Sequence, residues 1–130
     1  MTVQEGKAVL RGLPGVQGIW PQIEVAKTEQ QIFACCSAIG SLGASLCKEV
    51  GPTAYAAVHE AAGHLYFGMS GERRSFHDSR SPEEDLRDSV MYADHARKAY
   101  LNWYVYGPTI QICAHCGAMV WGDDICPCRS

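Results

Sequence analysis

The sequence predicts a mainly α-helical protein, a small three-helix bundle that ends in a C-terminal β-hairpin. Three stretches repeat apolar residues at steps of three and four, which is the period of a helix that buries one face. The chain has 130 residues, of which 47% are hydrophobic, and this is enough for one domain with a modest core. We therefore expect a single domain with three parts: an N-terminal arm (1–27), a helical bundle (28–107) and the hairpin (108–130).

Residues 1–27 are expected to form a loop-rich arm, with at most one short element around Val3–Leu10. Three glycines and two prolines lie between Gly12 and Pro21, and both residue types interrupt regular structure. Four apolar side chains of the arm are expected to lay it across the core: Leu13, Val16, Ile19 and Trp20.

The first helix is expected to begin after Thr28, because Thr28 and Gln31 have the spacing of a capping box. Apolar residues then follow one helical face as far as Leu46. Gly51 and Pro52 end this helix and begin the second, since proline suits the first turn of a helix.

The second helix is expected to extend from Pro52 to the glycines of 68–71. The sequence Ser81–Glu84 combines a cap, a first-turn proline and the acid of a capping box, so it begins the third helix. This helix should continue to about Tyr106. Its expected core side comprises Leu86, Ala93, Ala96, Tyr100 and Tyr104.

Four cysteines stand in two close pairs near the C-terminus: Cys113 and Cys116, then Cys126 and Cys128. Two close pairs separated by a short loop can bring four sulfurs around one tetrahedral Zn²⁺. Gly117 gives the first pair the backbone freedom to curl around a metal. We expect a structural zinc site, because four thiolates fill the coordination sphere and leave no position for water or substrate.

Residues 113–128 resemble a zinc ribbon or a zinc knuckle, and the resemblance covers only this C-terminal part of the chain. One residue, Pro127, separates the second pair, whereas a ribbon repeats the two-residue spacing of the first pair. Either a turn at Pro127 brings both thiols to the metal, or His115 or His64 replaces one of them. The alternative to a metal site is a disulfide or a set of free thiols.

His59, Glu60 and His64 are similar to the zincin signature His-Glu-x-x-His, but their spacing is one residue too long. Histidines five residues apart diverge by about 140° on a regular helix, so they cannot share one zinc ion without a local bulge. The apolar face around Val58 and Leu65 places Glu60 and His64 on the opposite, solvated side of the helix. A zinc hydrolase built on these three residues is therefore the least favoured function.

The N-terminal residues lack a basic start followed by an apolar stretch, so no secretory signal is expected. Seven cysteines without such a signal favour a reducing, cytoplasmic location, where thiols bind metal or pack as small apolar groups. The uncharged segment Ile32–Cys47 has sixteen residues, fewer than the about twenty of a membrane-spanning helix. We therefore expect no membrane segment.

The net charge of −3 and the isoelectric point of about 5.9 argue against a broad phosphate-binding surface. The loop that contains Arg73, Arg74 and Arg80 is a candidate contact for phosphate or RNA, since arginine binds phosphate in a forked geometry. Nearby acidic residues balance the charge of this loop. A nucleic-acid-binding regulator is therefore the second hypothesis.

The first hypothesis is a non-enzymatic, zinc-stabilised binding protein that docks on a protein partner as an accessory subunit or inhibitor. The sequence contains no Gly-rich phosphate loop and no recognisable order of catalytic residues. The third helix has more aromatic residues than one buried face needs, and Trp103 is the candidate anchor for a partner. Small acidic inhibitors made by phages or mobile elements fit this description.

Overall fold

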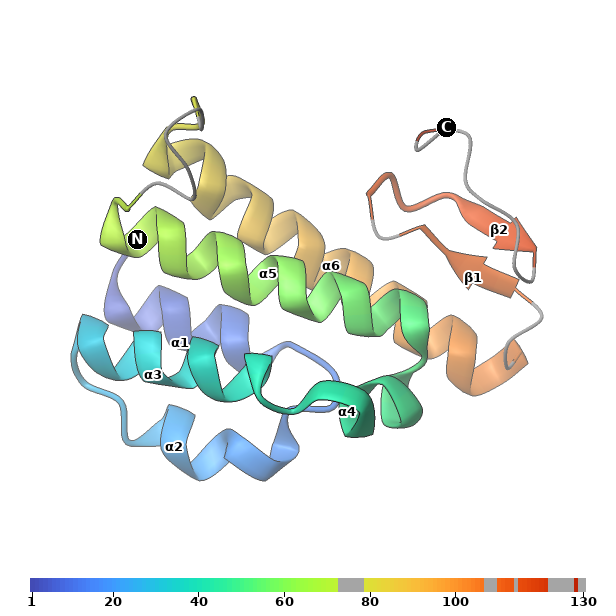
Figure 1. Ribbon diagram of the computed structural model, residues 1–130, viewed down its shortest axis with the longest axis horizontal. Helices are drawn as coiled ribbons and strands as arrows, with labels where there is room; N and C mark the ends of the chain where they lie inside the picture. The colour runs from blue at the N-terminus through green and yellow to red at the C-terminus, as the bar shows by residue number, and fades with distance from the viewer. Residues whose placement is uncertain (73–78, 107–109, 114, 122–127, 129–130) are drawn as a thin grey trace.

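A computed structural model describes residues 1–72, 79–106, 110–113, 115–121 and 128 of the chain. The fold is mainly helical, as the sequence predicts (Figure 1). In chain order the elements are α1 (Val3–Arg11), the 3-10 helix η1 (Gln17–Ile19), α2 (Trp20–Glu24), α3 (Glu29–Gly40), α4 (Gly43–Val50), α5 (Pro52–Ser70), α6 (Pro82–Tyr106), β1 (Ile110–Ile112) and β2 (Met119–Trp121).

The antiparallel pair α5 and α6 forms the centre of the fold, and α3 packs along α5 (Figure 1). The two central helices approach closely because small residues lie between them. A Cβ added to Gly68 would be 2.6 Å from Cγ of Leu86, so no larger residue fits there without a shift. The largest apolar side chains of the core are fully buried and come from five helices and the loop after α1: Leu10, Val16, Ile23, Ile32, Ile39, Leu46, Val50, Val58 and Leu65.

The N-terminal arm is more helical than the sequence predicted. A capping box begins α1, in which the Thr2 hydroxyl accepts from the Glu5 amide and the Glu5 carboxylate accepts from the Thr2 amide. The sequence interpretation missed this box and expected at most one short element, whereas α2 is a second helix that buries Ile23. Of the four apolar residues expected to pack the arm on the core, Leu13 and Val16 are buried, but Trp20 is 42% exposed.

The expected first helix is two helices. Its capping box at Thr28 and Gln31 is present, but α3 ends at Gly40 and α4 begins at Gly43 with the two axes bent by 75°. Gly43 has a φ of +55°, a conformation that glycine adopts without the steric penalty of a Cβ. The bend carries α4 against α5 and α6, so the three-helix prediction was too simple.

The buried side of α6 differs from the expected one at its C-terminal end. Tyr92, Ala93, Ala96 and Ala99 are buried, whereas Tyr104 is 77% exposed. The cause is local: Trp103 packs on Gly51, which precedes α5, and the next side chain, Tyr104, points about 100° away from Trp103 around the helix.

Two short antiparallel strands follow α6, with Ile110 opposite Trp121 and Ile112 opposite Met119. Between them the chain turns tightly: the Cys113 amide donates to the Ala118 carbonyl at 2.7 Å, and the Gly117 amide donates to the Cys113 carbonyl at 2.9 Å. The φ of +78° at Gly117 explains why a glycine follows the first cysteine pair. The hairpin lies beside the second half of α6 (Figure 1).

Within the described residues, no single helix has the length and apolar character needed to cross a membrane. The segments α3 and α4 meet that criterion only when taken together, as a pair bent by 75°.

Candidate metal centre

Three cysteines converge at the turn of the hairpin. One sulfur atom each from Cys113, Cys116 and Cys128 lies within 4.8 Å of the others, and the sulfurs of Cys113 and Cys128 are 3.5 Å apart. Two thiolates on one tetrahedral zinc, with bonds of about 2.3 Å, would have sulfurs about 3.8 Å apart. A disulfide would require about 2.05 Å. The three sulfurs therefore fit the ligand sphere of a soft divalent ion such as zinc.

Two of the three cysteines, Cys113 and Cys116, lie in the turn between the strands. Cys113 directly follows β1 and is buried, whereas Cys116 and Cys128 are exposed. The backbone amide of His115 donates to the Cys113 sulfur at 3.4 Å. Such N–H donors hold a thiolate in place and stabilise its negative charge, as the outer hydrogen bonds of metal ligands do.

The fourth predicted ligand, Cys126, lies outside the described residues. His115 and His64, the alternatives to a missing thiol, are not members of the group of close ligand atoms found in the described part of the chain. The Nδ1 atom of His115 is instead 3.1 Å from the hydroxyl of Tyr92 on α6.

The hairpin rests on α6 through residues next to the cysteines. Besides the hydrogen bond between Tyr92 and His115, the rings of these two residues meet edge to face at 5.9 Å. Gly117 lies so close to α6 that an added Cβ would be 3.3 Å from Nε2 of His95. The geometry of the candidate metal turn is therefore tied to the position of α6.

A buried charged network lies under this contact. The His64 ring stacks on Tyr92 with centroids 5.3 Å apart and planes at 3°. Its Nδ1 is 2.7 Å from the Asp85 carboxylate, and its Nε2 is 3.2 Å from the Glu60 carboxylate. Ionised carboxylates only accept hydrogen bonds, so a proton on either imidazole nitrogen of His64 has a carboxylate to receive it.

The sequence interpretation placed His64 on a solvated face of the helix, and this prediction was wrong. Its closeness to Glu60 is confirmed, but His64 is 4% exposed because α6 covers this side of α5. Asp85, which sequence reasoning did not single out, is 3% exposed and also pairs with Arg80 at 3.3 Å. The available signal was the seven-residue spacing of Asp85 and Tyr92, which places both on one face of α6.

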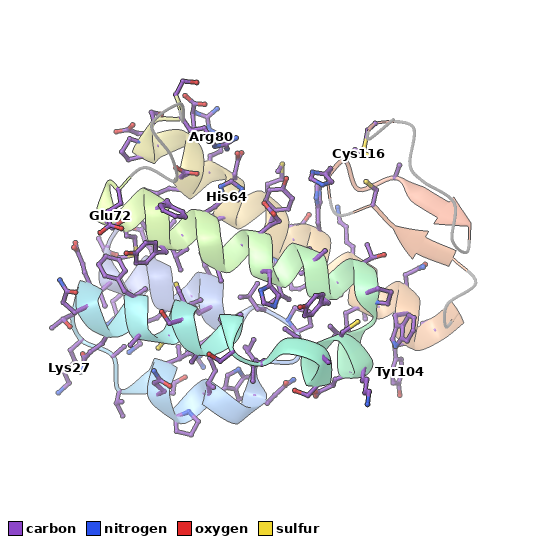
Figure 2. The ribbon with its side chains drawn as sticks, in the orientation of Figure 1. Lys27, His64, Glu72, Arg80, Tyr104 and Cys116 are labelled. Atoms are coloured by element: carbon purple, nitrogen blue, oxygen red, sulfur yellow. The ribbon has the colours of Figure 1, made fainter. Side chains whose placement is uncertain are left out.

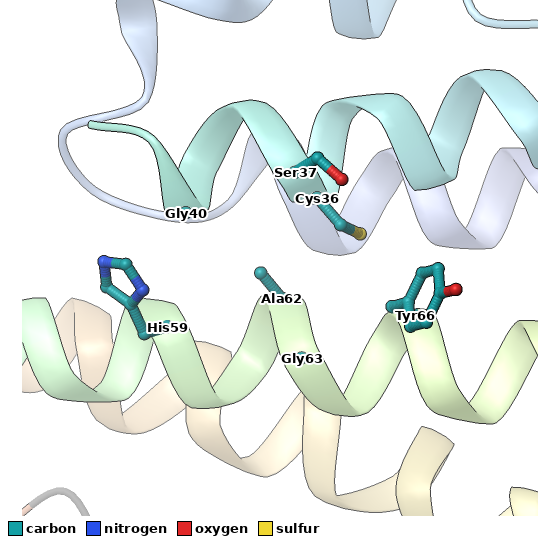
Figure 3. A pocket seen from close by; sticks show the side chains of 7 residues that line it. All are labelled: Cys36, Ser37, Gly40, His59, Ala62, Gly63 and Tyr66. Atoms are coloured by element: carbon teal, nitrogen blue, oxygen red, sulfur yellow. The ribbon is translucent and has the colours of Figure 1, made fainter. Parts of the chain in front are cut away.

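The three residues of the zincin-like sequence do not converge. His59 lines a hollow between α3 and α5, where it faces Gly40 of α3 (Figure 3). His64 instead contacts Asp85 on α6. Burial lowers the pKa of His59, so its imidazole favours the neutral form.

The chain matches no protein family, no curated protein and no solved structure. The chemistry of its surfaces must therefore be inferred from its own residues.

The residues predicted to contact a partner have different environments. Arg73 and Arg74 lie outside the described residues. The guanidinium of Arg80 pairs with the carboxylates of Asp85 and Asp88. Trp103 packs against Gly51, where an added Cβ would be 2.5 Å from its ring. The large apolar side chains exposed on this part of α6 are Leu101 (61%), Tyr104 (77%) and Val105 (64%).

Proposed function

We propose that this chain is a non-enzymatic binding protein that docks on a protein partner as an accessory subunit or inhibitor, and that one structural zinc ion stabilises it. The ion would be held by Cys113, Cys116, Cys126 and Cys128. The observation that carries the binding role is the exposed apolar group at the C-terminal end of α6, which consists of Leu101, Tyr104 and Val105.

These three side chains are neighbours on the helix surface, since residues three and four apart lie on one face. We call them the α6 patch. Isolated exposed apolar residues are ordinary, but an adjacent group that includes a tyrosine is typical of an interface anchor. Tyr104 projects away from the body of the protein (Figure 2). A partner that covers the α6 patch would remove this apolar area from water.

The proposed zinc ion has a structural role beside the α6 patch. A hairpin with three residues in each strand is too small to be stable in water by itself. Thiolates gather around a metal only in the folded chain, so metal binding contributes directly to folding free energy. The ion would thus fix the hairpin against the second half of α6, next to the α6 patch.

Charge favours a protein over a nucleic acid as the partner. The chain has a net charge of −3, and the carboxylates of Asp85 and Asp88 offset the charge of Arg80. Nucleic-acid binding depends on several cationic groups that face phosphates, and its affinity decreases steeply with salt.

To test the binding role, the tagged, zinc-loaded chain is used to capture its partner from a lysate of the cells that produce the chain. The complex is then reconstituted with the purified partner. The double variant Leu101→Ser/Tyr104→Ser should weaken the complex by at least about tenfold, or about 1.4 kcal/mol. Val25→Ser is the matched control, because Val25 is 64% exposed but follows α2. Equal affinities for both variants would refute a role of the α6 patch, and salt-sensitive retention of RNA would favour the nucleic-acid hypothesis.

A further inference from the structure

Helix α6 carries a second apolar stripe, in addition to the one that packs on α5. Four of the seven large apolar side chains that are exposed in the described part of the chain belong to α6: Val90 (48%), Leu101 (61%), Tyr104 (77%) and Val105 (64%). At about 100° per residue, these four side chains lie within an arc of about 100°. The buried residues Ser89 and Ala96 lie on the opposite side of the helix. An arc of this width is what a helix presents to a neighbour on which it packs.

The same face of α6 is basic, although the chain as a whole is acidic. The charged residues on this arc, or within about 20° of it, are Arg87, Asp94, Arg97 and Lys98. We call the face that these residues and the four apolar side chains form the outer face of α6. Three basic groups and one acid give it a charge of +2, whereas the chain has a net charge of −3. Positive charge is therefore concentrated beside the exposed apolar side chains.

The acid of the outer face leaves its two nearest cations open to further contacts. Asp94 pairs with Lys98 at 3.1 Å and with Arg97 at 3.6 Å, and all three side chains are about half exposed. Exposed ion pairs of this kind contribute little to stability. The guanidinium of Arg97 also donates to the carbonyl of Gly12 at 3.3 Å, which holds it in place at the edge of the face. Because lysine has three donors and arginine has five, both cations can also bind a carboxylate from a partner.

A second helix has the shape that fits the outer face. Val90 and Val105 are fifteen residues apart, about 22 Å along the axis, so a helix of about 15 residues can cover this length. Its apolar side chains would interdigitate with the α6 patch, and acids beside them would meet Arg97 and Lys98. An anionic membrane fits less well, because its headgroups would also surround Asp94 and repel this carboxylate.

We propose that the outer face of α6 docks an amphipathic helix of the partner protein, in which acidic residues flank the apolar stripe. The inference rests on the proposed binding role and deepens it, because it names the kind of segment that the partner contributes. The α6 patch supplies the apolar contact, whereas Arg97 and Lys98 select acidic over basic helices.

Two synthetic peptides of about 18 residues, long enough to cover the face, serve as probes. Both carry leucines at helical spacing and a staple that keeps them helical, and they differ in the residues that flank the leucines: glutamate in one peptide, lysine in the other. Each labelled peptide is titrated with the full-length chain, and fluorescence anisotropy gives the dissociation constant. We expect the glutamate peptide to bind at least about tenfold more tightly than the lysine peptide, with a difference that decreases as salt is added.

Two variants separate the contributions of charge and of apolar contact. Lys98→Glu should weaken binding of the glutamate peptide by at least about tenfold. Lys27→Glu is the matched control, because it makes the same change of charge at an exposed position far from Tyr104 (Figure 2), and it should bind like the wild-type chain. Leu101→Ser should weaken binding of both peptides, since both place leucines on the α6 patch.

The inference is overturned if the glutamate peptide does not bind at concentrations up to about 1 mM, or if the lysine peptide binds equally well. It is also overturned if Leu101→Ser abolishes binding to phosphatidylserine vesicles, or dissociates a dimer of the chain in sedimentation, because the occupant is then a membrane or a second copy. A captured protein whose complex is weakened by Leu101→Ser/Tyr104→Ser would still support the proposed function after such a result. The two failures are therefore distinguishable.

Discussion

The Nδ1 atom of His64 lies 2.7 Å from Oδ1 of Asp85, and both side chains are almost completely buried between α5 and α6. Tyr92 stacks on the same imidazole and forms a hydrogen bond with His115 of the hairpin. Tyr92 therefore links the packing of α5 on α6 to the contact that positions the cysteine-containing turn of the hairpin. Substitutions in the network should change the stability of the helical body and the order of the hairpin together.

Asp85→Asn should lower the free energy of unfolding by about 3 kcal/mol, because it removes the buried carboxylate that contacts both His64 and Arg80 and leaves the buried imidazole with only the half-exposed Glu60 carboxylate. Glu60→Gln is the matched control: it removes a carboxylate from the same imidazole, but the Glu60 side chain is 47% exposed. Water can replace the exposed partner, so the control should lose less than about 1 kcal/mol. Urea unfolding of both variants measures the difference. If both variants lost the same free energy of unfolding, Asp85 would not be the main partner of the buried imidazole.

Cys116→Ser should abolish the proposed zinc binding, because it removes one of three sulfurs that lie within 4.8 Å of one another. Elemental analysis of chain purified without chelator should find one zinc per wild-type chain and much less than one in the variant. Cys47→Ser and His59→Ala are controls that should retain the metal, since neither residue is in the sulfur group. A wild-type chain without stoichiometric zinc, with disulfides among these cysteines, would exclude the metal site.

Chelation of the proposed zinc ion should lower the melting temperature and shift amide resonances of the hairpin and of α6 near Tyr92 and His95. The reason is that metal binding energy is folding energy in a segment with two three-residue strands. NMR spectra before and after chelator report both effects. Unchanged resonances around Tyr92 would show that the hairpin and α6 are not coupled.

The pKa of Cys36, raised by burial to about 12, predicts a loss of stability at alkaline pH. A thiol in an unfolded chain titrates near about 8.5, so the fold favours the protonated form. The contribution of the protonated Cys36 thiol to the free energy of unfolding is complete below about pH 8.5 and decreases as the pH rises toward 12. Between pH 8.5 and 10.5 the free energy of unfolding should decrease by about 2–3 kcal/mol, at about 1.36 kcal/mol per pH unit. Urea unfolding at these two pH values should show a smaller loss for Cys36→Ala than for the wild-type chain.

Local chemistry made much of the fold predictable from sequence. The capping residues at Thr28 and Ser81 and the proline at position 52 begin helices where the pattern indicated. The close spacing of Cys113 and Cys116 also indicated their convergence, because a tight turn brings residues three apart together. These features depend on a few neighbouring residues, so no knowledge of tertiary contacts was needed.

Long-range packing set the features that the sequence did not reveal. Nothing local distinguishes a solvated His64 from one covered by α6, and the seven-residue spacing of Asp85 and Tyr92 was ambiguous without the position of α5. The apolar pattern of α6 likewise predicted a buried Tyr104, but helix periodicity does not show which of the adjacent residues Trp103 and Tyr104 packs on the start of α5. The sequence interpretation continued one helix through Gly43, because the φ of +55° that breaks it is a property of the folded chain.

Gly51→Ala should be among the most damaging single substitutions in the helical body. Gly51 has a φ of +89° and a ψ of 158°, a region that is almost exclusive to glycine and costs other residues about 1–3 kcal/mol. An added methyl group would also lie 2.5 Å from the Trp103 ring, so α4, α5 and the end of α6 would have to move apart. We expect a loss of about 3 kcal/mol or more in the free energy of unfolding, from the backbone strain and the clash together.

Gly63→Ala is the matched control for this effect, because Gly63 lies within α5 and an added Cβ would meet no atom within 4 Å. Helix propensity alone should raise the stability of this variant by about 0.5–1 kcal/mol. Thermal and urea unfolding of the two variants should therefore move in opposite directions. If Gly51→Ala were as stable as the wild-type chain, the close packing of Trp103 on the start of α5 would be wrong, and with it the reason given for the exposure of Tyr104.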